Sequence, residues 1–376
     1  MKKTASNAHI WTRCVGYIRA ATDFIERYGM MESPAAKEGK MAHALAENLI
    51  NAMQRTGNPS PEVPKEMDGI VLPVDMKIKI SDYAHLCYSV MRRAMVLGGP
   101  DLYIEREVPC TFLEEGVTTR VDFALFDRKN GQLIVTDLKY GHRRVEAEDN
   151  PQLIIGARAI MDELKERGET LENVSLNIFQ PNGPNASMPL DQWTLSEEEL
   201  REKSWRIKTL YHMEGNSLTP GRHCRNCEAR GGCDAVRAAL YESWDVMAMY
   251  NGIPENLPVE TLEKMMAEMD VFKDLLRGYQ TGLEAMVVSR LKAGENFNLW
   301  EYSTSLSDRK WNYPEKDIIE MGHSFGLNLE KTTVLSPKQA EDAGMPKEVV
   351  ETLVRRDSTG LKLRKKSLKT LRQAFR

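Results

Sequence analysis

The sequence lacks the features that mark membrane proteins, secreted proteins and ATP-driven motors. In its 376 residues no apolar run approaches the roughly 20 residues that cross a bilayer. Met1 to Ala8 has no signal-peptide core, and the chain holds no Walker A loop, no helicase motif, no internal repeat and no long low-complexity segment. We therefore expect a cytoplasmic protein that neither contacts membranes nor drives a motor with ATP.

An excess of charge of one sign is also missing. The net charge is -4, with 41% hydrophobic and 28% charged residues, as in ordinary globular proteins. Any DNA-binding face must therefore be local. The segment from Val354 to Arg376 has nine Lys or Arg against one Asp, so Lys365 and Lys366 are candidate phosphate contacts. The alternative is a solvated tail.

Cysteines are few, and a reducing cytoplasm disfavours structural disulfides. Cys224, Cys227 and Cys233 have C-x2-C-x5-C spacing, which brings three thiolates around one metal centre within a tight loop. Three cysteines need a fourth ligand, and a zinc site could recruit His223 or His212. Cys87 and Cys110 lie outside this spacing pattern and are expected to be core residues.

A β-hairpin is predicted from Thr119 to Gly141. Two apolar runs flank a turn containing Asn130 and Gly131, a pair that suits a tight reversal. Counting outward from the turn places Asp122 on one arm nearly opposite Asp137 on the other. Both arms are apolar on both faces, which is typical of a covered, central part of a sheet.

Strand alternation directs Lys139 to the same face as Asp137. A buried carboxylate is costly unless it is paired or binds a metal. Two carboxylates can hold Mg²⁺ or Mn²⁺, while a nearby lysine orients the attacking water and stabilises a phosphodiester transition state. The alternative is that Asp137 and Lys139 are solvated edge residues and Asp122 only ends a turn.

One histidine and one glutamate are further candidates for metal ligands. A helix is predicted from about Ala35 to Gln54, where His43 and Glu47 share a face. An imidazole there could complete a metal site, or the two could form a surface pair. Glu105 lies on a predicted strand, 101 to 108, and Glu107 shares its face.

The remaining pattern predicts an α/β protein with a mostly helical C-terminal part. We expect helices at about 74–97 and 149–167, a strand at 174–181, a short opening helix with Ser6 or Asn7 as its cap, and a loop at 56–72. We also expect a long helix or helix pair at 259–291, a strand-containing module at 297–335 and a helix opening at Ser336. The predicted domains are 1–245 and 246–376.

Together these motifs resemble the PD-(D/E)XK nucleases, in particular the RecB-like exonuclease branch, and an uncharacterised phage family from recombination modules. The resemblance rests on His43, Asp122, the Asp137-Leu138-Lys139 triplet and Gln152, and runs from about residue 8 to 245. It departs at Gly156, where the family carries a tyrosine. It implies a central mixed sheet flanked by helices and metal-dependent DNA cleavage.

The resemblance also implies roles for single residues. His43, Asp122, Asp137 and the backbone carbonyl of Leu138 would hold Mg²⁺ or Mn²⁺, with Glu105 as an outer or second-metal ligand. Lys139 would orient or activate the attacking water, and Gln152 would contact DNA. RecB-like nucleases with a [4Fe–4S] cluster take one cysteine from far upstream, which makes Cys14 the implied partner of Cys224, Cys227 and Cys233.

The expected function is resection of linear DNA by an exonuclease in phage or prophage recombination, inside a bacterial host. A single-strand annealing or single-strand-binding protein is a possible partner. Two alternatives stay open: a non-catalytic DNA-binding recombination scaffold, and a zinc-stapled endonuclease acting on particular DNA structures.

Overall fold

The structure is a computed structural model that describes residues 1–29, 34–95, 100–249, 257–306, 310–329, 335–355 and 358–365. The chain forms two compact units, one made of Met1–Glu32 with Ser89–Asn296 and the other of Ser33–Tyr88 with Phe297–Arg376. Each unit is described by itself below. The domain boundary expected near residue 245 stays a prediction.

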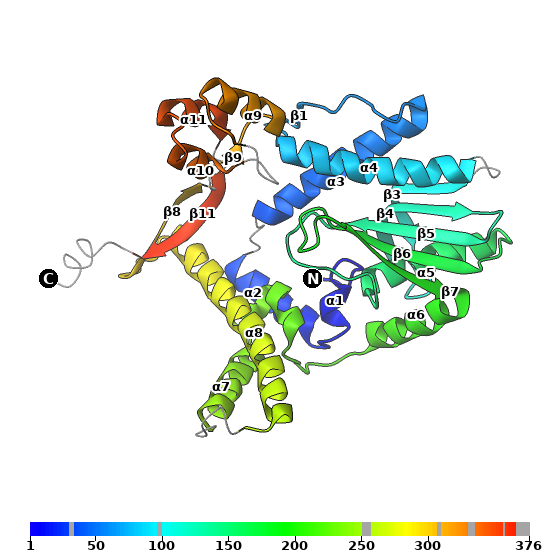
Figure 1. Cartoon of the computed structure of the whole chain (residues 1–376). Helices are drawn as coiled ribbons and strands as arrows, with labels where there is room; N and C mark the ends of the chain where they lie inside the picture. Colours follow the sequence, from blue (N-terminus) through cyan, green and yellow to red (C-terminus); the bar gives the residue numbers. More distant parts are fainter. Residues whose placement is uncertain are drawn as a thin grey trace. The chain divides into compact units, whose positions relative to one another are not determined.

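The first unit is built on a five-stranded mixed sheet with the order β3-β4-β5-β6-β7 (Figure 1). Its strands are β3 (Asp101–Pro109), β4 (Thr118–Asp127), β5 (Gln132–Leu138), β6 (Asn173–Phe179) and β7 (Leu190–Ser196). Only β5 and β6 run parallel, and helix α5 (Pro151–Glu166) connects them, since parallel neighbours need a crossover. The predicted α/β class is confirmed.

The predicted hairpin is confirmed as β4 and β5. Asp127 closes the turn by accepting hydrogen bonds from the Lys129 N–H at 3.0 Å and Asn130 Nδ2 at 2.7 Å. Gly131 has a φ of 57°, a left-handed backbone conformation that is unfavourable for residues with a side chain. Phe123 and Phe126 are fully buried, so the apolar runs that predicted the strands form the centre of the core.

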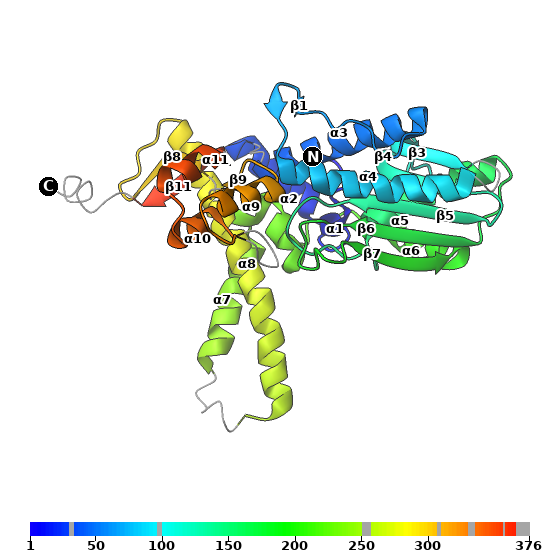
Figure 2. The same ribbon diagram turned by 45° about the horizontal axis from the view of Figure 1, so that its top comes forward.

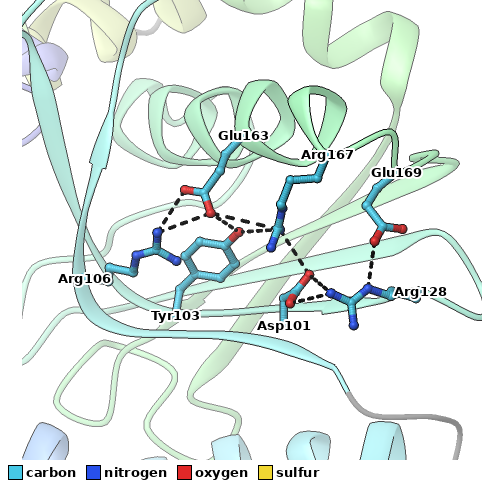
Figure 3. Close-up of polar contacts among 7 residues, drawn as sticks. All are labelled: Asp101, Tyr103, Arg106, Arg128, Glu163, Arg167 and Glu169. Carbon is cyan, nitrogen blue, oxygen red and sulfur yellow. Dashed lines mark hydrogen bonds and ion pairs between the residues drawn. The ribbon is translucent and has the colours of Figure 1, made fainter.

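Ion pairs hold the C-terminal end of α5 against β3 and β4 at the turn end of the sheet (Figure 3). Arg128 Nη2 donates to Asp101 Oδ1 at 2.7 Å, and the Tyr103 hydroxyl donates to Glu163 Oε1 at 3.1 Å. Burial, reinforced by Glu163, raises the pKa of Tyr103 to about 12. The guanidinium groups are close to half exposed, so these pairs define the packing more than they add to stability.

The short opening helix predicted after Ser6 or Asn7 is confirmed as α1 (Ala8–Trp11), and Asn7 occupies its N-cap position without a side-chain cap. A second helix, α2 (Tyr17–Tyr28), follows after a break. The break has a physical cause at Gly16, whose N–H donates to Ser217 O at 2.9 Å. A Cβ at Gly16 would lie only 2.9 Å from the backbone oxygen of Asn216, so this close approach needs a glycine between α1 and α2.

Three α-helices and two short 3-10 helices follow the sheet in the described part of the first unit. They are α6 (Glu197–His212), η1 (Arg222–Asn226), η2 (Glu228–Gly231), α7 (Asp234–Met249) and α8 (Val259–Lys292). The predicted long helix is therefore one helix, and Figure 2 shows α7 and α8 side by side. Gly282 of α8 lies so close to η2 that an added Cβ would be 2.3 Å from Gly231 N.

The second unit contains α3 (Pro34–Thr56) and most of α4 (Val74–Met95), as predicted. The expected loop between them holds two short paired strands, β1 (Glu66–Met67) and β2 (Ile70–Val71). No described helix is both long and apolar enough to cross a membrane.

The C-terminal part of this unit contains short strands and helices around a small core. Strands β8 (Trp300–Leu306) and β9 (Lys310–Trp311) pair with β11 (Ser358–Lys365) and β10 (Val354–Arg355), respectively. The helices are α9 (Glu315–Ser324), α10 (Pro337–Asp342) and α11 (Lys347–Leu353). The predicted start at Ser336 is confirmed, because its side chain accepts from the Gln339 N–H. Lys365 ends β11, and Lys366 lies outside the described residues.

Candidate active site and cysteine cavity

The hairpin brings the two predicted aspartates together. Phe123 pairs with Thr136, which places Asp122 and Asp137 next to each other one step further from the turn. Asp122 Oδ2 accepts a hydrogen bond from the Leu138 N–H at 2.8 Å, so this carboxylate also ties β4 to the end of β5. The sequence register therefore correctly predicted this pair.

Lys139 lies between the carboxylates and α5. Its Nζ is 2.8 Å from Asp137 Oδ2 and donates to Gln152 Oε1 at 2.9 Å. Its backbone N–H donates to Phe179 O at 2.9 Å, which holds it beside β6. Burial by itself would lower the pKa of the Lys139 ammonium, but Asp137 and then Asp122 outweigh burial, and the pKa is raised. Lys139 is therefore a cation at neutral pH.

The start of α5 positions Gln152. Asn150 caps the helix by accepting from the Gln152 N–H at 3.0 Å, and Pro151 at the first turn is preorganised for a helix. Gly156 faces β4: a Cβ there would lie 3.3 Å from Val121 Cγ2. This glycine serves close helix packing and not base stacking.

Glu105 adopts an unusual backbone conformation beside Asp122. Its φ is 45°, a left-handed value that is rare for a residue with a long side chain and typical of functional sites. The side chain is 7% exposed, and Oε2 accepts from Arg120 Nε at 2.6 Å. Carboxylate oxygens of Glu105 and Asp122 lie within 4.8 Å of each other, whereas Glu107 is exposed.

The donor set fits a hard divalent cation. Glu105 on β3 and Asp122 on β4 have carboxylate oxygens within 4.8 Å of each other, and Asp137 on β5 lies next to Asp122 in the register. Oxygen ligands are what Mg²⁺ and Mn²⁺ prefer. Asp137 Oδ2 is buried and, although it pairs in charge with Lys139, it accepts no aligned hydrogen bond from the part of the chain that the structure describes. His43 belongs to α3 in the other unit, so its role as a ligand stays a prediction, as does that of the Leu138 carbonyl.

Residues that sequence reasoning missed reach the same region from distant segments. Asn226 Nδ2 lies 3.4 Å from His9 Nε2, and Arg143 Nη1 donates to Asn226 Oδ1 at 3.4 Å. Burial, reinforced by the nearby charges of Lys139, Arg13 and Arg143, lowers the pKa of His9 to about 4. No local motif marks His9 or Asn226, because only the tertiary fold brings them together.

The loop after Lys139 is held rigidly. Gln180 Nε2 donates to Gly141 O at 2.8 Å and also to Arg143 O, and Gln180 Oε1 accepts from the Val145 N–H at 3.0 Å. Asn182 Nδ2 donates to Tyr140 O at 2.7 Å. One buried glutamine and one asparagine thus set the course of the chain next to the carboxylates.

The four predicted cysteine ligands line a single cavity. Cys14, from the break between α1 and α2, faces Cys224, Cys227 and Cys233, so the upstream and downstream cysteines are brought together. Burial, reinforced by the neighbouring thiols, raises the pKa of Cys224 to about 11 and that of Cys227 to about 12. Such thiols remain protonated unless a metal replaces the proton.

Of the two histidines considered as zinc ligands, only His223 lines the cavity. His223 Nε2 is 3.0 Å from Thr219 O and 3.8 Å from Cys224 Sγ, whereas His212 is exposed and does not line the cavity. Cys14 and His223 are therefore both placed where a fourth ligand would be needed.

The comparison with known families covers almost the whole chain. Residues 2–366 match the model of a family described as "Protein of unknown function (DUF2800)". The match includes the carboxylates, Lys139, Gln152 and all four cysteines of the cavity. The chain therefore belongs to the DUF2800 family.

Proposed function

We propose that this protein is a metal-dependent deoxyribonuclease with a PD-(D/E)XK core. The observation that carries the proposal is the convergence of Asp122, Asp137 and Lys139 at the end of the β4–β5 hairpin, with Gln152 touching the lysine. A mixed sheet flanked by helices is consistent with that core. Structural ion pairs are common elsewhere in this protein, but here the single Lys139 ammonium serves two carboxylates, Asp137 and Asp122, on neighbouring strands.

Glu105, Asp122 and Asp137 would hold Mg²⁺ or Mn²⁺, with His43 and the Leu138 carbonyl as further expected ligands. When bound, the cation would supply a nucleophilic water at neutral pH and neutralise charge on the phosphodiester. The Asp122 carboxylate stays oriented by the Leu138 N–H, and Arg120 orients Glu105. These contacts preorganise the carboxylates before substrate arrives.

The charge of Lys139 defines its part in the reaction. Because its pKa is raised, Lys139 does not accept a proton at neutral pH in the metal-free protein. Its ammonium instead donates hydrogen bonds and stabilises negative charge that develops on the phosphate. Gln152 is a positioning residue. Its Oε1 accepts a hydrogen bond from Lys139 Nζ, which orients the remaining N–H groups of the ammonium toward the carboxylates.

We further propose that the cysteine cavity holds a [4Fe–4S] cluster. Support comes from the gathering of four thiols, one from far upstream and three from the C-x2-C-x5-C segment, around one cavity. The cluster would join Cys14 to the segment from Cys224 to Cys233 and so make folding of this region depend on iron.

The specific reaction that we propose is degradation of linear DNA in phage or prophage recombination, with a single-strand annealing or single-strand-binding protein as a possible partner. The test is release of labelled nucleotides from linear and circular DNA, single and double stranded, with Mg²⁺ or Mn²⁺. Lys139→Ala should abolish release. Lys129→Ala, at an exposed lysine of the hairpin turn, should leave it unchanged.

Each alternative has its own outcome. Cleavage of circles or branched substrates by a colourless protein with stoichiometric zinc would support the zinc-stapled endonuclease. Iron-loaded, folded protein that binds DNA but cleaves no substrate with either cation would support the scaffold.

A further inference from the structure

The loop that follows Lys139 contacts the loop between two of the cysteines. Arg143, four residues after Lys139, donates to Asn226, which lies between Cys224 and Cys227 and also contacts His9. Arg143 is positioned by Gln180, which accepts from the Val145 N–H and donates to the Arg143 carbonyl. A rigid bridge therefore runs from the candidate active site to the cysteine cavity.

Arginines gather on this bridge. Arg225 Nη1 lies 2.8 Å from Asp274 Oδ1 of α8, and Arg143 Nη2 lies 3.9 Å from Asp274 Oδ2. Arg222, at the start of η1, is exposed and near enough to repel Arg143. We call Arg143, Arg222 and Arg225 the arginine patch.

The arginine patch has more positive charge than its one aspartate neutralises. Arg143 is 41% exposed and Arg225 33%, so their outer N–H groups remain open to solvent. Burial lowers the pKa of Arg143 and Arg225 lowers it further, while Asp274 opposes them. An anion placed among these guanidinium groups would relieve their repulsion.

We propose that the arginine patch binds backbone phosphates of the DNA strand, next to the phosphate that is cleaved. Guanidinium groups bind phosphate through paired hydrogen bonds, and such contacts fix the register of a nucleic acid without reading its sequence. Asn226 and His9 add neutral hydrogen-bonding groups between the patch and Lys139. The cysteine loop thereby forms part of the DNA-binding surface.

This inference rests on the proposed function for the identity of its ligand, but its test measures binding and not cleavage. Fluorescence anisotropy of a short labelled single strand and of the matching duplex is recorded in metal-free buffer over a series of salt concentrations. Arg143→Gln and Arg225→Gln should each weaken binding about tenfold. Each should also reduce the slope of log K against log salt by about 0.7–0.9. Arg206→Gln, at an exposed arginine of α6, is the matched control and should change neither quantity.

Asp274→Asn separates phosphate binding from a structural role. Removing this carboxylate leaves the patch more positive, so DNA should bind more tightly. If the arginines only hold α8 against the cysteine loop, Asp274→Asn will weaken binding as Arg225→Gln does, and the inference is wrong. Iron content and visible absorbance of every variant show whether the cysteine loop is intact.

The two proposals can fail separately. Cleavage that proceeds with unchanged affinity and salt slope in Arg143→Gln would overturn the arginine patch and leave the nuclease standing. Reduced affinity in a protein that cleaves nothing would do the reverse.

Discussion

At the scale of single residues, the candidate site combines groups that need one another. Asp137 keeps Lys139 charged, Lys139 neutralises Asp137 in a buried position, and Gln152 holds the ammonium in place. Glu105 accepts a strained backbone to reach Asp122. Carboxylates this close repel one another in the absence of a cation, which is a stability cost typical of functional sites.

His9 predicts a pH dependence of stability. Its pKa is about 4 in the folded protein and about 6.5 in the unfolded chain. Since the unfolded chain binds more protons between these values, His9 lowers the free energy of unfolding as pH falls from about 6.5 toward 4. Between pH 7.5 and 5.0 the wild type should lose about 2 kcal/mol more than His9→Gln, measured by urea unfolding. Equal losses would show that native His9 titrates normally.

At the scale of elements, α8 is part of the cysteine region. Gly278 and Gly282 lie one turn apart and let the helix backbone approach η1 and η2, with Gly278 facing Arg225 and Gly282 facing Gly231. The sequence shows the two glycines but does not predict this packing, because by helix propensity alone a glycine only weakens a helix.

Gly282→Ala tests this packing. The new methyl group would clash with the backbone of Gly231 and force α8 away, at a cost of roughly 1–3 kcal/mol or more. Gly39→Ala in α3, where an added Cβ meets nothing within 4 Å, is the matched control and should stabilise by about 0.5–1 kcal/mol. Urea unfolding measures both, and iron per chain should fall only in Gly282→Ala. Equal stability of the two variants would contradict the close approach.

At the scale of the whole molecule, the cysteine cavity links segments that are far apart in the sequence. Cys14 lies near the start of the chain, and its three partners follow the sheet and α6. A bound cluster would restrict the unfolded chain by closing a long loop, in addition to the direct metal–sulfur bonds.

Cys14→Ala is therefore expected to lose most of its iron and to unfold at a lower temperature than the wild type. Cys87→Ala, at a buried thiol that does not line the cavity, should keep its iron. Iron analysis and thermal unfolding of anaerobically purified protein measure both effects. Full iron content in Cys14→Ala would show that another residue supplies the fourth ligand.

The sequence by itself determined the local structure of the candidate site. The apolar runs VDFALF and QLIVTDL and the Asn130-Gly131 turn set the hairpin register, and that register places Asp122 beside Asp137. The C-x2-C-x5-C spacing likewise grouped Cys224, Cys227 and Cys233. Both are short-range patterns, in which backbone geometry leaves little freedom, whereas the distant Cys14 came from the resemblance to nucleases with a cluster.

Only the tertiary structure decided what lies around these motifs. The break at Gly16, the left-handed Glu105, the approach of α8 through Gly282 and the meeting of His9, Arg143 and Asn226 all depend on contacts between distant segments. Propensity and periodicity describe neighbours along the chain, whereas these features follow from packing and from the pairing of buried polar groups. The arginine patch that we propose as a DNA contact likewise depends on the tertiary structure.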